Sequence, residues 1–493
     1  MRKSALSVLF SAVMLISILL SGCAAPTAAP TQPAAPQPTV AVEVTKEVVV
    51  TQQVEITSTP APDRVQVTWY IGLGAGSQAA QIPLEKAFAD KFNASQSEIQ
   101  LIPIIVDNKY AKDNLTAQIA VGNAPDIVGP VGTAGRMAFP GAFLDIEPLV
   151  KQFNYDTSDI DPAFTDFYRD EGKLVGLPFA IFPEFVFVNK DLFKEAGLNL
   201  PPQKYGDKYT MPDGKQVDWS WDTVAEIGKI LTVDKNGNDA TSANFDAKNI
   251  VQYGWVPQWT DHPRAVGSLF GAWEMVGPDG KAVIPEAERA ALKYYYDAMW
   301  GPQPFAPNKA AMDSDLMKGN AFSSGKVAMG TSHLWYTCCV DTKNVPNWDA
   351  AVMPSYNGKV TSKMHGDTFS IMKDTKNPEA AFKVYAYMLG EGAADLYSIY
   401  GGLPARKSQQ AAFFANLDKT FAPNKVNWQV AIDSIPFMDV PNHEHVVTQY
   451  YTKVYDVGST FTTKLQTDGK ITDFNAAVDE FVKQLSDALA SGV

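Results

Sequence analysis

An apolar run broken by a proline and a carboxylate, residues 172–197, constrains the fold of this chain more than any other stretch. It opens with a glycine–lysine turn, is rich in Phe, Val and Ile over 179–188, and passes into a helical pattern after 189–191. A run of this length bounded by turn signals is typical of a buried strand. Pro183 and Glu184 interrupt it, and proline is poorly tolerated in a central strand. We therefore predict that the chain bends or crosses between two bodies here, and that Glu184 faces a ligand.

The N-terminus has the layout of an export signal. Arg2 and Lys3 precede an apolar run, 5–20, which is followed by Leu-Ser-Gly-Cys. A positive start, a short apolar segment and small residues mark a signal peptide, and the run is too short to span a membrane comfortably. Cysteine after Leu-Ser-Gly resembles the bacterial lipobox, which implies cleavage before Cys23 and its lipidation. The alternative is an ordinary signal peptide with an incidental cysteine. We expect residues 1–22 to be a lipoprotein signal peptide, and Cys23 to anchor the protein outside the cytoplasm on the bacterial cell membrane.

Residues 23–63 are expected to form a tether. Ala, Pro, Thr and Gln dominate 24–38, a composition that cannot form a core and stays extended. Residues 40–56 alternate valine with polar residues, but no partner strand lies within reach of a short loop. We interpret them as part of the same spacer, so the folded part begins near Arg64.

The charge of the chain excludes one class of partner. The net charge is −13, and removing residues 1–22 deletes Arg2 and Lys3 and makes it −15. No basic face or nucleic-acid-binding motif is present, and an acidic chain is a poor ligand for phosphate backbones. We expect no nucleic-acid partner. No later segment is long and apolar enough to cross a membrane.

Cys338 and Cys339 are the two cysteines that remain besides Cys23. In an exported protein an even pair of cysteines suggests a disulfide. A bridge between neighbours strains the usual geometry, so two buried free thiols remain an equal alternative at this point.

Strands and helices alternate after residue 64. Residues 65–71 alternate as a strand and end in a glycine-rich loop, a helical stripe covers 79–93, and a further strand, helix and strand follow up to residue 133. The glycine loop matches neither the Walker nor the dinucleotide fingerprint. This order predicts an α/β fold with a parallel sheet, in which ligands bind at the carboxyl ends of the strands. Residues 74–78 and 129–133 are therefore predicted to share one rim.

The later motifs resemble a known family. The lipobox, GLPF before NKDLF, GKVAM and GGLPARK follow in that order. This order resembles the extracellular solute-binding proteins of ABC importers, in particular their sugar-binding, maltose-binding-protein-like branch, from about Val65 to the C-terminus. The resemblance implies two α/β lobes joined by crossing segments, with the ligand held in the cleft between them. It implies residues 64–180 plus 364–397 for lobe 1 and 181–363 plus 398–493 for lobe 2.

Carbohydrate sites combine aromatic faces with carboxylates, amides and backbone groups that bond hydroxyls. Glu184 is a candidate because a carboxylate in an apolar run needs a polar partner; the alternative is an interlobe salt bridge. Tryptophans are also often buried for packing alone. The remaining ligand-binding candidates lie at predicted rim positions or in loops: Gln78, Thr133, Trp255, Trp273, His333, Trp335, Tyr336, His365 and Asp367.

Two further patterns raise the question of a metal. His443 and His445 stand two residues apart, so they share no helix face, and H-E-x-x-H is absent. Residues 234–239 resemble a calcium loop but lack the EF-hand glycine and the last glutamate. A tight polar turn is the favoured interpretation there, with calcium left open. We predict no metal and no cofactor.

Three functions remain to be weighed. The leading hypothesis is a non-catalytic, monomeric receptor that captures a mono- or oligosaccharide by cleft closure and delivers it to an ABC permease. The second is an extracellular glycoside hydrolase, which needs two carboxylates across one bond. The third is a binder of a polyol phosphate with the same fold, which needs basic residues in the cleft.

Overall fold

The computed structural model describes residues 55–56, 63–444 and 451–491 of the 493-residue chain. The predicted signal peptide, Cys23 and nearly all of the predicted tether lie outside these residues. Residues Gln52–Val493 form one compact unit. Within the described residues, no helix combines the length and hydropathy needed to span a membrane.

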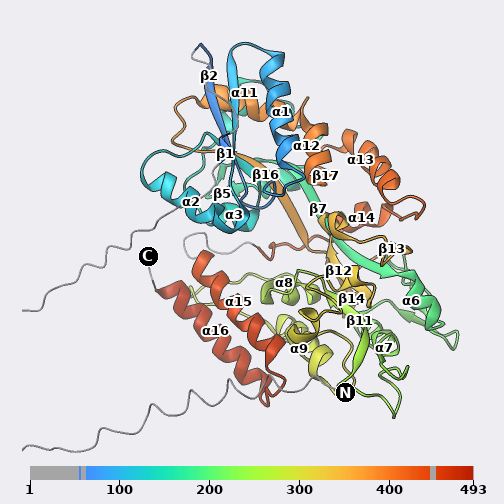
Figure 1. The fold of residues 1–493 in the computed structure, drawn as a ribbon. Coiled ribbons are helices and arrows are strands. Elements are labelled where there is room, and N and C mark those ends of the chain that lie inside the picture. The colour runs from blue at the N-terminus through green and yellow to red at the C-terminus, as the bar shows by residue number, and fades with distance from the viewer. Residues whose placement is uncertain (1–54, 57–62, 445–450, 492–493) are drawn as a thin grey trace, which may run out of the picture. The chain divides into compact units, whose positions relative to one another are not determined.

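Strand β7, Leu177–Asn189, lies at the centre of the sheet in this unit, and all 13 of its residues are buried. Its first half pairs with β16, Met364–Ile371, up to the pair Met364–Pro183. Its second half pairs with β12, Val327–His333, from the pair His333–Glu184 onward. The strand therefore changes partner between Pro183 and Glu184 while its backbone runs on from one half of the sheet to the other (Figure 1). The predicted buried strand is confirmed, and the proline marks the exchange of neighbours.

We call the elements on the β16 side the first lobe. Its half of the 11-stranded sheet has the order β1-β3-β2-β4-β16, with β2 parallel to both β3 and β4. This is the predicted α/β unit with parallel strands. Its elements are β1 (Glu55–Ile56), β2 (Val65–Ile71), α1 (Ile82–Ser95), β3 (Ile99–Ile105), α2 (Asn108–Ala120), β4 (Ile127–Gly132), α3 (Thr133–Met137), α4 (Glu147–Gln152), α5 (Pro162–Asp166), β5 (Arg169–Asp170), β6 (Lys173–Leu174), β16, α11 (Pro378–Leu389), α12 (Ala393–Tyr400) and β17 (Leu403–Pro404).

One detail of the first lobe corrects the predicted tether. Glu55 and Ile56 pair antiparallel with Ile105 and Ile104 of β3. Both residues belong to the segment 40–56, which is predicted to be spacer because no partner strand lies nearby in the sequence. The partner comes from about fifty residues further along, a distance that only the folded sheet bridges.

The second lobe continues the sheet through β12-β11-β10, with β13 also paired to β7. Strand β11 runs parallel to β12. Its elements are α6 (Lys190–Glu195), β8 (Lys208–Thr210), β9 (Gln216–Asp218), α7 (Trp221–Ile230), β10 (Val233–Asp234), β11 (Ile250–Pro257), α8 (Pro263–Gly267), η1 (Ser268–Phe270), α9 (Glu286–Trp300), α10 (Lys309–Met312), η2 (Phe322–Ser324), β12, η3 (Leu334–Cys339), β13 (Trp348–Ala351), β14 (Ser355–Tyr356), β15 (Lys359–Val360), α13 (Lys407–Thr420), α14 (Gln429–Ser434), η4 (Ile435–Phe437), α15 (Tyr451–Thr467) and α16 (Phe474–Ala490).

Further segments meet β7 near its exchange of partners. Leu403 and Pro404 of β17 pair with Ile181 and Ala180. The backbone N–H of Glu184 donates to the carbonyl of Lys363, 3.0 Å away. These contacts bring Lys363 and Leu403–Pro404 to the same stretch of β7.

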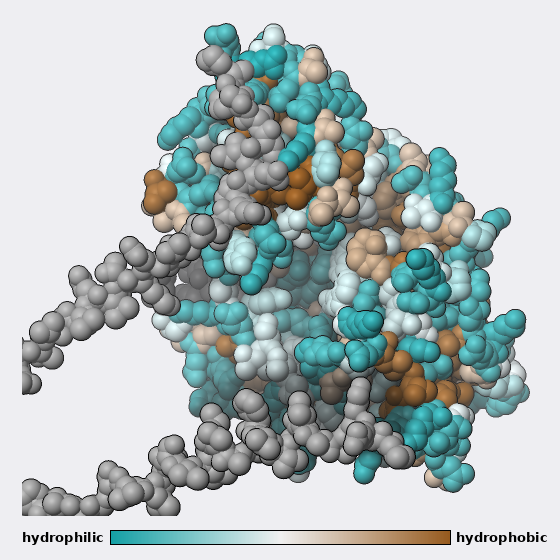
Figure 2. Space-filling model, viewed as in Figure 1, coloured by the Kyte–Doolittle hydropathy of each residue, from teal (hydrophilic) through white to brown (hydrophobic). Residues whose placement is uncertain are grey.

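The core follows the apolar pattern of the sequence. Trp219, Trp221 and Trp348, which are not among the ligand-binding candidates, are buried. The face drawn in Figure 2 is mostly hydrophilic, with hydrophobic residues in small patches. No single apolar surface dominates this view.

Candidate functional site

A cleft of about 770 Å³ lies between the lobes. This volume is within the range of small-molecule sites. First-lobe walls come from the loop after β2, the end of β4 and the α12–β17 turn, and η3 supplies the second-lobe wall. Helix α13, which packs against β17, completes the lining. The lining residues are Leu73, Gly74, Ala75, Gln78, Ala80, Gln81, Leu84, Gly132, Ala134, Gly135, Phe182, Trp335, Thr337, Cys338, His365, Asp367, Tyr397, Ser398, Ile399, Tyr400, Gly401, Phe413, Asn416, Leu417, Thr420, Phe421 and Glu444.

Trp335 gives the cleft an aromatic wall. It is half-buried on η3, and its ring lies parallel to that of Trp259, with centroids 6.3 Å apart and planes 7° apart. Its indole N–H donates to Nδ1 of His365, 3.1 Å away. The ring is therefore held in place before any ligand arrives, as a stacking surface must be to bind without a large entropic cost.

A disulfide joins Cys338 and Cys339 at the end of η3. Cys338 is exposed and lines the cleft three residues after Trp335. The sequence left free thiols as an equal alternative; in the structure the pair is bridged and its apolar surface borders the site.

The polar lining of the cleft is acidic or neutral. Gln78 and Asn416 are exposed in it, and Asp367 and Glu444 add two carboxylates. Burial and the neighbouring Glu444 raise the pKa of Asp367 to about 7. Among the described lining residues there is no lysine or arginine. The cleft therefore offers acceptors and neutral donors for hydroxyls, and no fixed cation for an anion.

Four of the predicted ligand-binding residues lie in this cleft. They are Gln78, Trp335, His365 and Asp367. His333 lies behind His365, with its ring stacked on that of His365 at 3.6 Å. Thr133 is fully buried at the start of α3, one residue beyond the lining residue Gly132.

Glu184 does not face the cleft, which corrects the leading interpretation of this residue. Its side chain has no exposed surface, and Oε1 lies 3.0 Å from Nζ of Lys363. The ammonium also donates to the carbonyl of Ala265, and Oε2 accepts from the backbone N–H of Lys363. Burial raises the pKa of Glu184, and the charge of Lys363 opposes that rise. The salt bridge weighed as the alternative is what the structure contains, because a carboxylate deep in an apolar strand needs a cation more than a ligand.

Three aromatic candidates also lie elsewhere. Trp255 is fully buried among the rings around Trp221, in the second-lobe core. Tyr336 is buried against Phe187, because the residue after Trp335 in η3 points into the protein. Trp273 is 36% exposed but does not line the cleft. The sequence predicts that these aromatic residues lie at strand ends or in loops. It does not show whether each side chain faces the cleft or the core.

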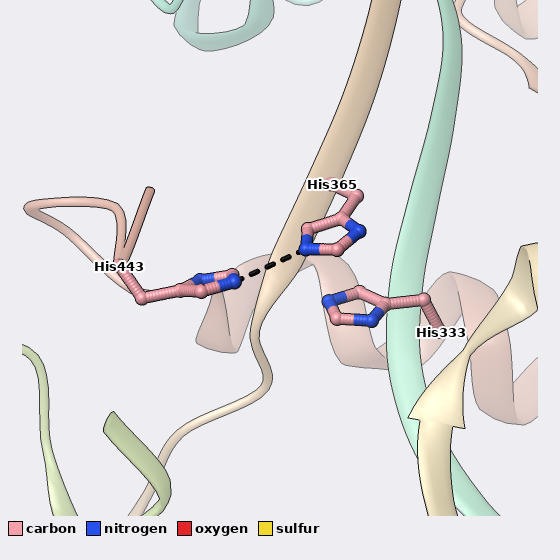
Figure 3. A group of neighbouring side chains, drawn as sticks. All are labelled: His333, His365 and His443. Carbon is pink, nitrogen blue, oxygen red and sulfur yellow. Dashed lines mark hydrogen bonds between the residues drawn. The ribbon is translucent and has the colours of Figure 1, made fainter. Parts of the chain in front are cut away.

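The structure unites three histidines that are far apart in the sequence. His333 ends β12, His365 lies in β16 and His443 follows η4, and their nitrogens come within 4.8 Å of one another (Figure 3). The Nε2 atoms of His365 and His443 are 3.1 Å apart, and Nδ1 of His443 lies 2.7 Å from Asp439. Burial is the main cause that lowers the pKa of all three imidazoles. His445 lies outside the described residues.

The calcium-like loop closes on itself. The Asp234 carboxylate accepts from the backbone N–H groups of Asn236, Asn238 and Asp246. Burial opposes the charged form, but these bonds lower the pKa of Asp234 to about 2. The favoured tight polar turn is what the chain forms here.

Several lining residues escaped the sequence analysis. Residues 397–401 and α13 carry no binding motif, and Glu444 was not among the ligand-binding candidates. The GGLPARK motif that follows Tyr400 was the signal that could have found the first group. Nothing local marks α13, because it reaches the cleft only through the packing of the lobes.

Comparison with known proteins identifies the family. Residues 87–423 match the model of the bacterial extracellular solute-binding proteins. The sn-glycerol-3-phosphate-binding periplasmic protein of Pectobacterium atrosepticum is 33% identical over 159 residues, which cover 27% of this chain and 34% of that protein. The chain thus spans about a third of the length of the curated relatives it matches.

Solved structures share the fold over most of the chain. An ABC substrate-binding protein of Listeria monocytogenes in complex with cycloalternan has a TM-score of 0.66 at 18% identity, covering 87% of this chain and 99% of that one. The sugar-binding protein MalE of Xanthomonas citri has a TM-score of 0.66 at 17% identity, covering 87% and 98%. At this identity the likeness shows the two-lobed fold alone. The family match covers well over half of the sequence, and the chain therefore belongs to the bacterial extracellular solute-binding proteins.

Proposed function

We propose that this protein captures a carbohydrate in the cleft and delivers it to an ABC import permease. We propose further that it works from the outer face of the cell membrane, anchored through lipidated Cys23. One observation carries the choice of ligand. The ring face of Trp335 lies beside carboxylates and amides, and no lysine or arginine is among the described residues that line the cleft. Aromatic faces bind the C–H surfaces of sugars, and carboxylates accept hydrogen bonds from their hydroxyls.

A polyol phosphate is the alternative that the name of the Pectobacterium relative suggests. Phosphate recognition calls for arginine, lysine or a cluster of backbone donors. Here Asp367 and Glu444 line the cleft instead, and their charge opposes a dianion. This contrast favours a neutral sugar.

A glycoside hydrolase is the other alternative, and the same two carboxylates are its best support. One of them, Asp367, has its pKa raised to about 7, as a general acid requires. The family and the similar structures are binding proteins, however, and not enzymes. We therefore propose binding without turnover, and the experiment below includes a product assay.

The proposed mechanism is closure of the lobes around the sugar. A ligand that contacts both walls stabilises the closed arrangement by its differential affinity for it. Residues from both lobes line the cleft, so a bound sugar contacts both. The shared strand β7 and the contacts at Lys363 and Leu403 lie where such a motion has its hinge.

A fluorescence titration of the full chain carrying Cys23→Ser tests this proposal. Mono-, di- and malto-oligosaccharides and sn-glycerol 3-phosphate are added in turn, and the sugar samples are analysed for hydrolysis products. We expect saturable quenching by at least one sugar, no quenching by the phosphate and no product. In the Trp335→Ala variant the affinity should fall about 10–100-fold, as for a buried aromatic anchor.

Trp273→Ala is the matched control, because it removes an exposed tryptophan outside the cleft. Its affinity should equal that of the parent. If glycerol phosphate alone quenches the fluorescence, the ligand of the cleft is a polyol phosphate and not a sugar. If hydrolysis products form, the protein is a hydrolase. No response to any sugar would overturn the carbohydrate assignment.

A further inference from the structure

The histidine cluster behind the cleft has a feature that sugar binding does not use. His333 is fully buried, and neither of its ring nitrogens has a hydrogen-bond partner among the described residues. Leaving buried polar atoms unpaired is costly. Unpaired buried nitrogens of this kind in a native fold suggest a bound ligand that supplies the missing partner.

We propose that His333, His365 and His443 form a binding site for a divalent transition-metal ion of the Zn²⁺ type. The three imidazoles come from β12, β16 and the segment after η4, and their ring nitrogens lie within 4.8 Å of one another (Figure 3). Three histidines that can each offer one ring nitrogen are the protein ligand set of many open zinc sites. The site goes beyond the proposed sugar binding and does not depend on it.

The pair His365–His443 already has the spacing of two ligands. Their Nε2 atoms are 3.1 Å apart. Two nitrogens bound to one tetrahedral zinc ion, each at about 2.0–2.1 Å, lie about 3.3 Å from each other. His333 has to approach by about 1.5 Å and turn out of its stack on His365, and no hydrogen bond within the described chain opposes that rotation.

The surroundings of His443 match those of a metal ligand. Its Nδ1 donates to the Asp439 carboxylate at 2.7 Å, which leaves the Nε2 lone pair directed at His365. Metal-bound histidines usually donate their second N–H to a carboxylate in this way. Asp439 is itself held by the backbone N–H groups of Met364 and His443.

A fourth ligand and an entry path are also present. Oε1 of Glu444 lies 3.5 Å from Nε2 of His365. His365 and Glu444 line both the main cleft and a smaller cavity of about 210 Å³. The charge of Lys363 acts on all three histidines, but Lys363 is paired with Glu184. Imidazole nitrogens with one carboxylate suit Zn²⁺, Co²⁺ or Ni²⁺ and disfavour Mg²⁺ and Ca²⁺.

Metal binding has to change one contact of Trp335. The indole N–H donates to Nδ1 of His365, so His365 without metal carries its proton on Nε2. Coordination through Nε2 moves that proton to Nδ1 and breaks the bond to Trp335. Zinc should therefore change the tryptophan fluorescence. Trp335→Phe, which removes the competing bond and no ligand, should bind zinc about fivefold more tightly.

Calorimetric titration of the chelator-stripped, tag-free full chain carrying Cys23→Ser, with Zn²⁺ and without sugar, tests the site. We expect one ion per chain, and visible absorption bands of a nitrogen-bound ion when Co²⁺ is used. His333→Gln and His443→Gln should each weaken zinc binding at least about 100-fold, and Asp439→Asn about 10–100-fold. Circular dichroism confirms that each variant is folded.

His262→Gln is the matched control. His262 lines the small cavity but lies outside the cluster, stacked on Tyr455, so this variant should bind zinc as the parent does. Zinc binding that survives the triple change of His333, His365 and His443 to Gln would overturn the proposal, as would a parent chain that binds none. The titration contains no sugar, so a failed carbohydrate assignment leaves this result unaffected.

Discussion

Glu184 and Lys363 bury a charge pair at the point where β7 changes partner. Both side chains are fully buried, and their charged atoms are 3.0 Å apart. A buried pair often contributes little net stability relative to apolar residues, but the loss of one partner leaves the other charged in an apolar environment. The pair therefore makes this part of β7 intolerant of single changes.

Lys363→Met should lower the free energy of unfolding by about 3–5 kcal/mol, measured by urea denaturation. The double variant Glu184→Leu, Lys363→Met should recover most of that loss, because no charge is stranded. Lys293→Met is the control: its partner Asp297 is exposed, and the loss should stay below about 0.5 kcal/mol. A single variant as stable as the parent would show that the pair is not needed by the fold.

At the scale of elements, α1 and α12 meet through a buried acid. Glu85 in the first turn of α1 is fully buried and accepts a hydrogen bond from the Tyr400 hydroxyl at 2.7 Å. Burial raises the pKa of Glu85 from 4.5 to about 7, although the bond from Tyr400 opposes that rise. The folded protein therefore holds this proton more tightly than the unfolded chain does.

The contribution of Glu85 to stability should be complete below about pH 4.5 and lost as the pH rises through 7. The loss is about 3 kcal/mol at most. In Glu85→Gln, which keeps an acceptor for Tyr400, the free energy of unfolding should fall less over this pH range. Urea denaturation at a series of pH values measures the difference between parent and variant. Glu98→Gln, at a surface ion pair with Lys383, serves as the control, and identical slopes for the parent and Glu85→Gln would contradict the prediction.

The elements also show where local sequence signals are reliable. The order of strand and helix patterns over residues 65–133 predicted the parallel strands β2, β3 and β4. Each of these strands can be recognised from the apolar residues of its own segment. Glu55 and Ile56 of β1 belong to a segment with the same pattern, but that pattern could not show that they pair with β3. Pro183 suggested a break, yet β7 continues, since the proline stands where one neighbouring strand gives way to another.

For the whole molecule, a ligand held by both lobes should act on shape and stability together. The sugar found by the fluorescence panel should lower the radius of gyration measured by small-angle X-ray scattering. At 100 times its dissociation constant it should raise the free energy of unfolding by about 2.7 kcal/mol. Trp335→Ala at the same sugar concentration should show a smaller change in both. Stabilisation without a change in radius would place the ligand on one lobe only.

The sequence by itself determined the α/β class, the buried strand at the centre of the chain and the family, since hydrophobic periodicity and short motifs are local. It also named Gln78, Trp335, His365 and Asp367, all of which line the cleft, Gln78 because loops at strand ends converge in such sheets and Trp335 through the family resemblance. Only the tertiary structure decided that Glu184 pairs with Lys363, that Trp255 and Tyr336 turn inward, and that His333, His365 and His443 meet. These outcomes depend on contacts between residues up to 179 positions apart. Side-chain direction at such contacts is set by the packing of both lobes, and no local pattern encodes it.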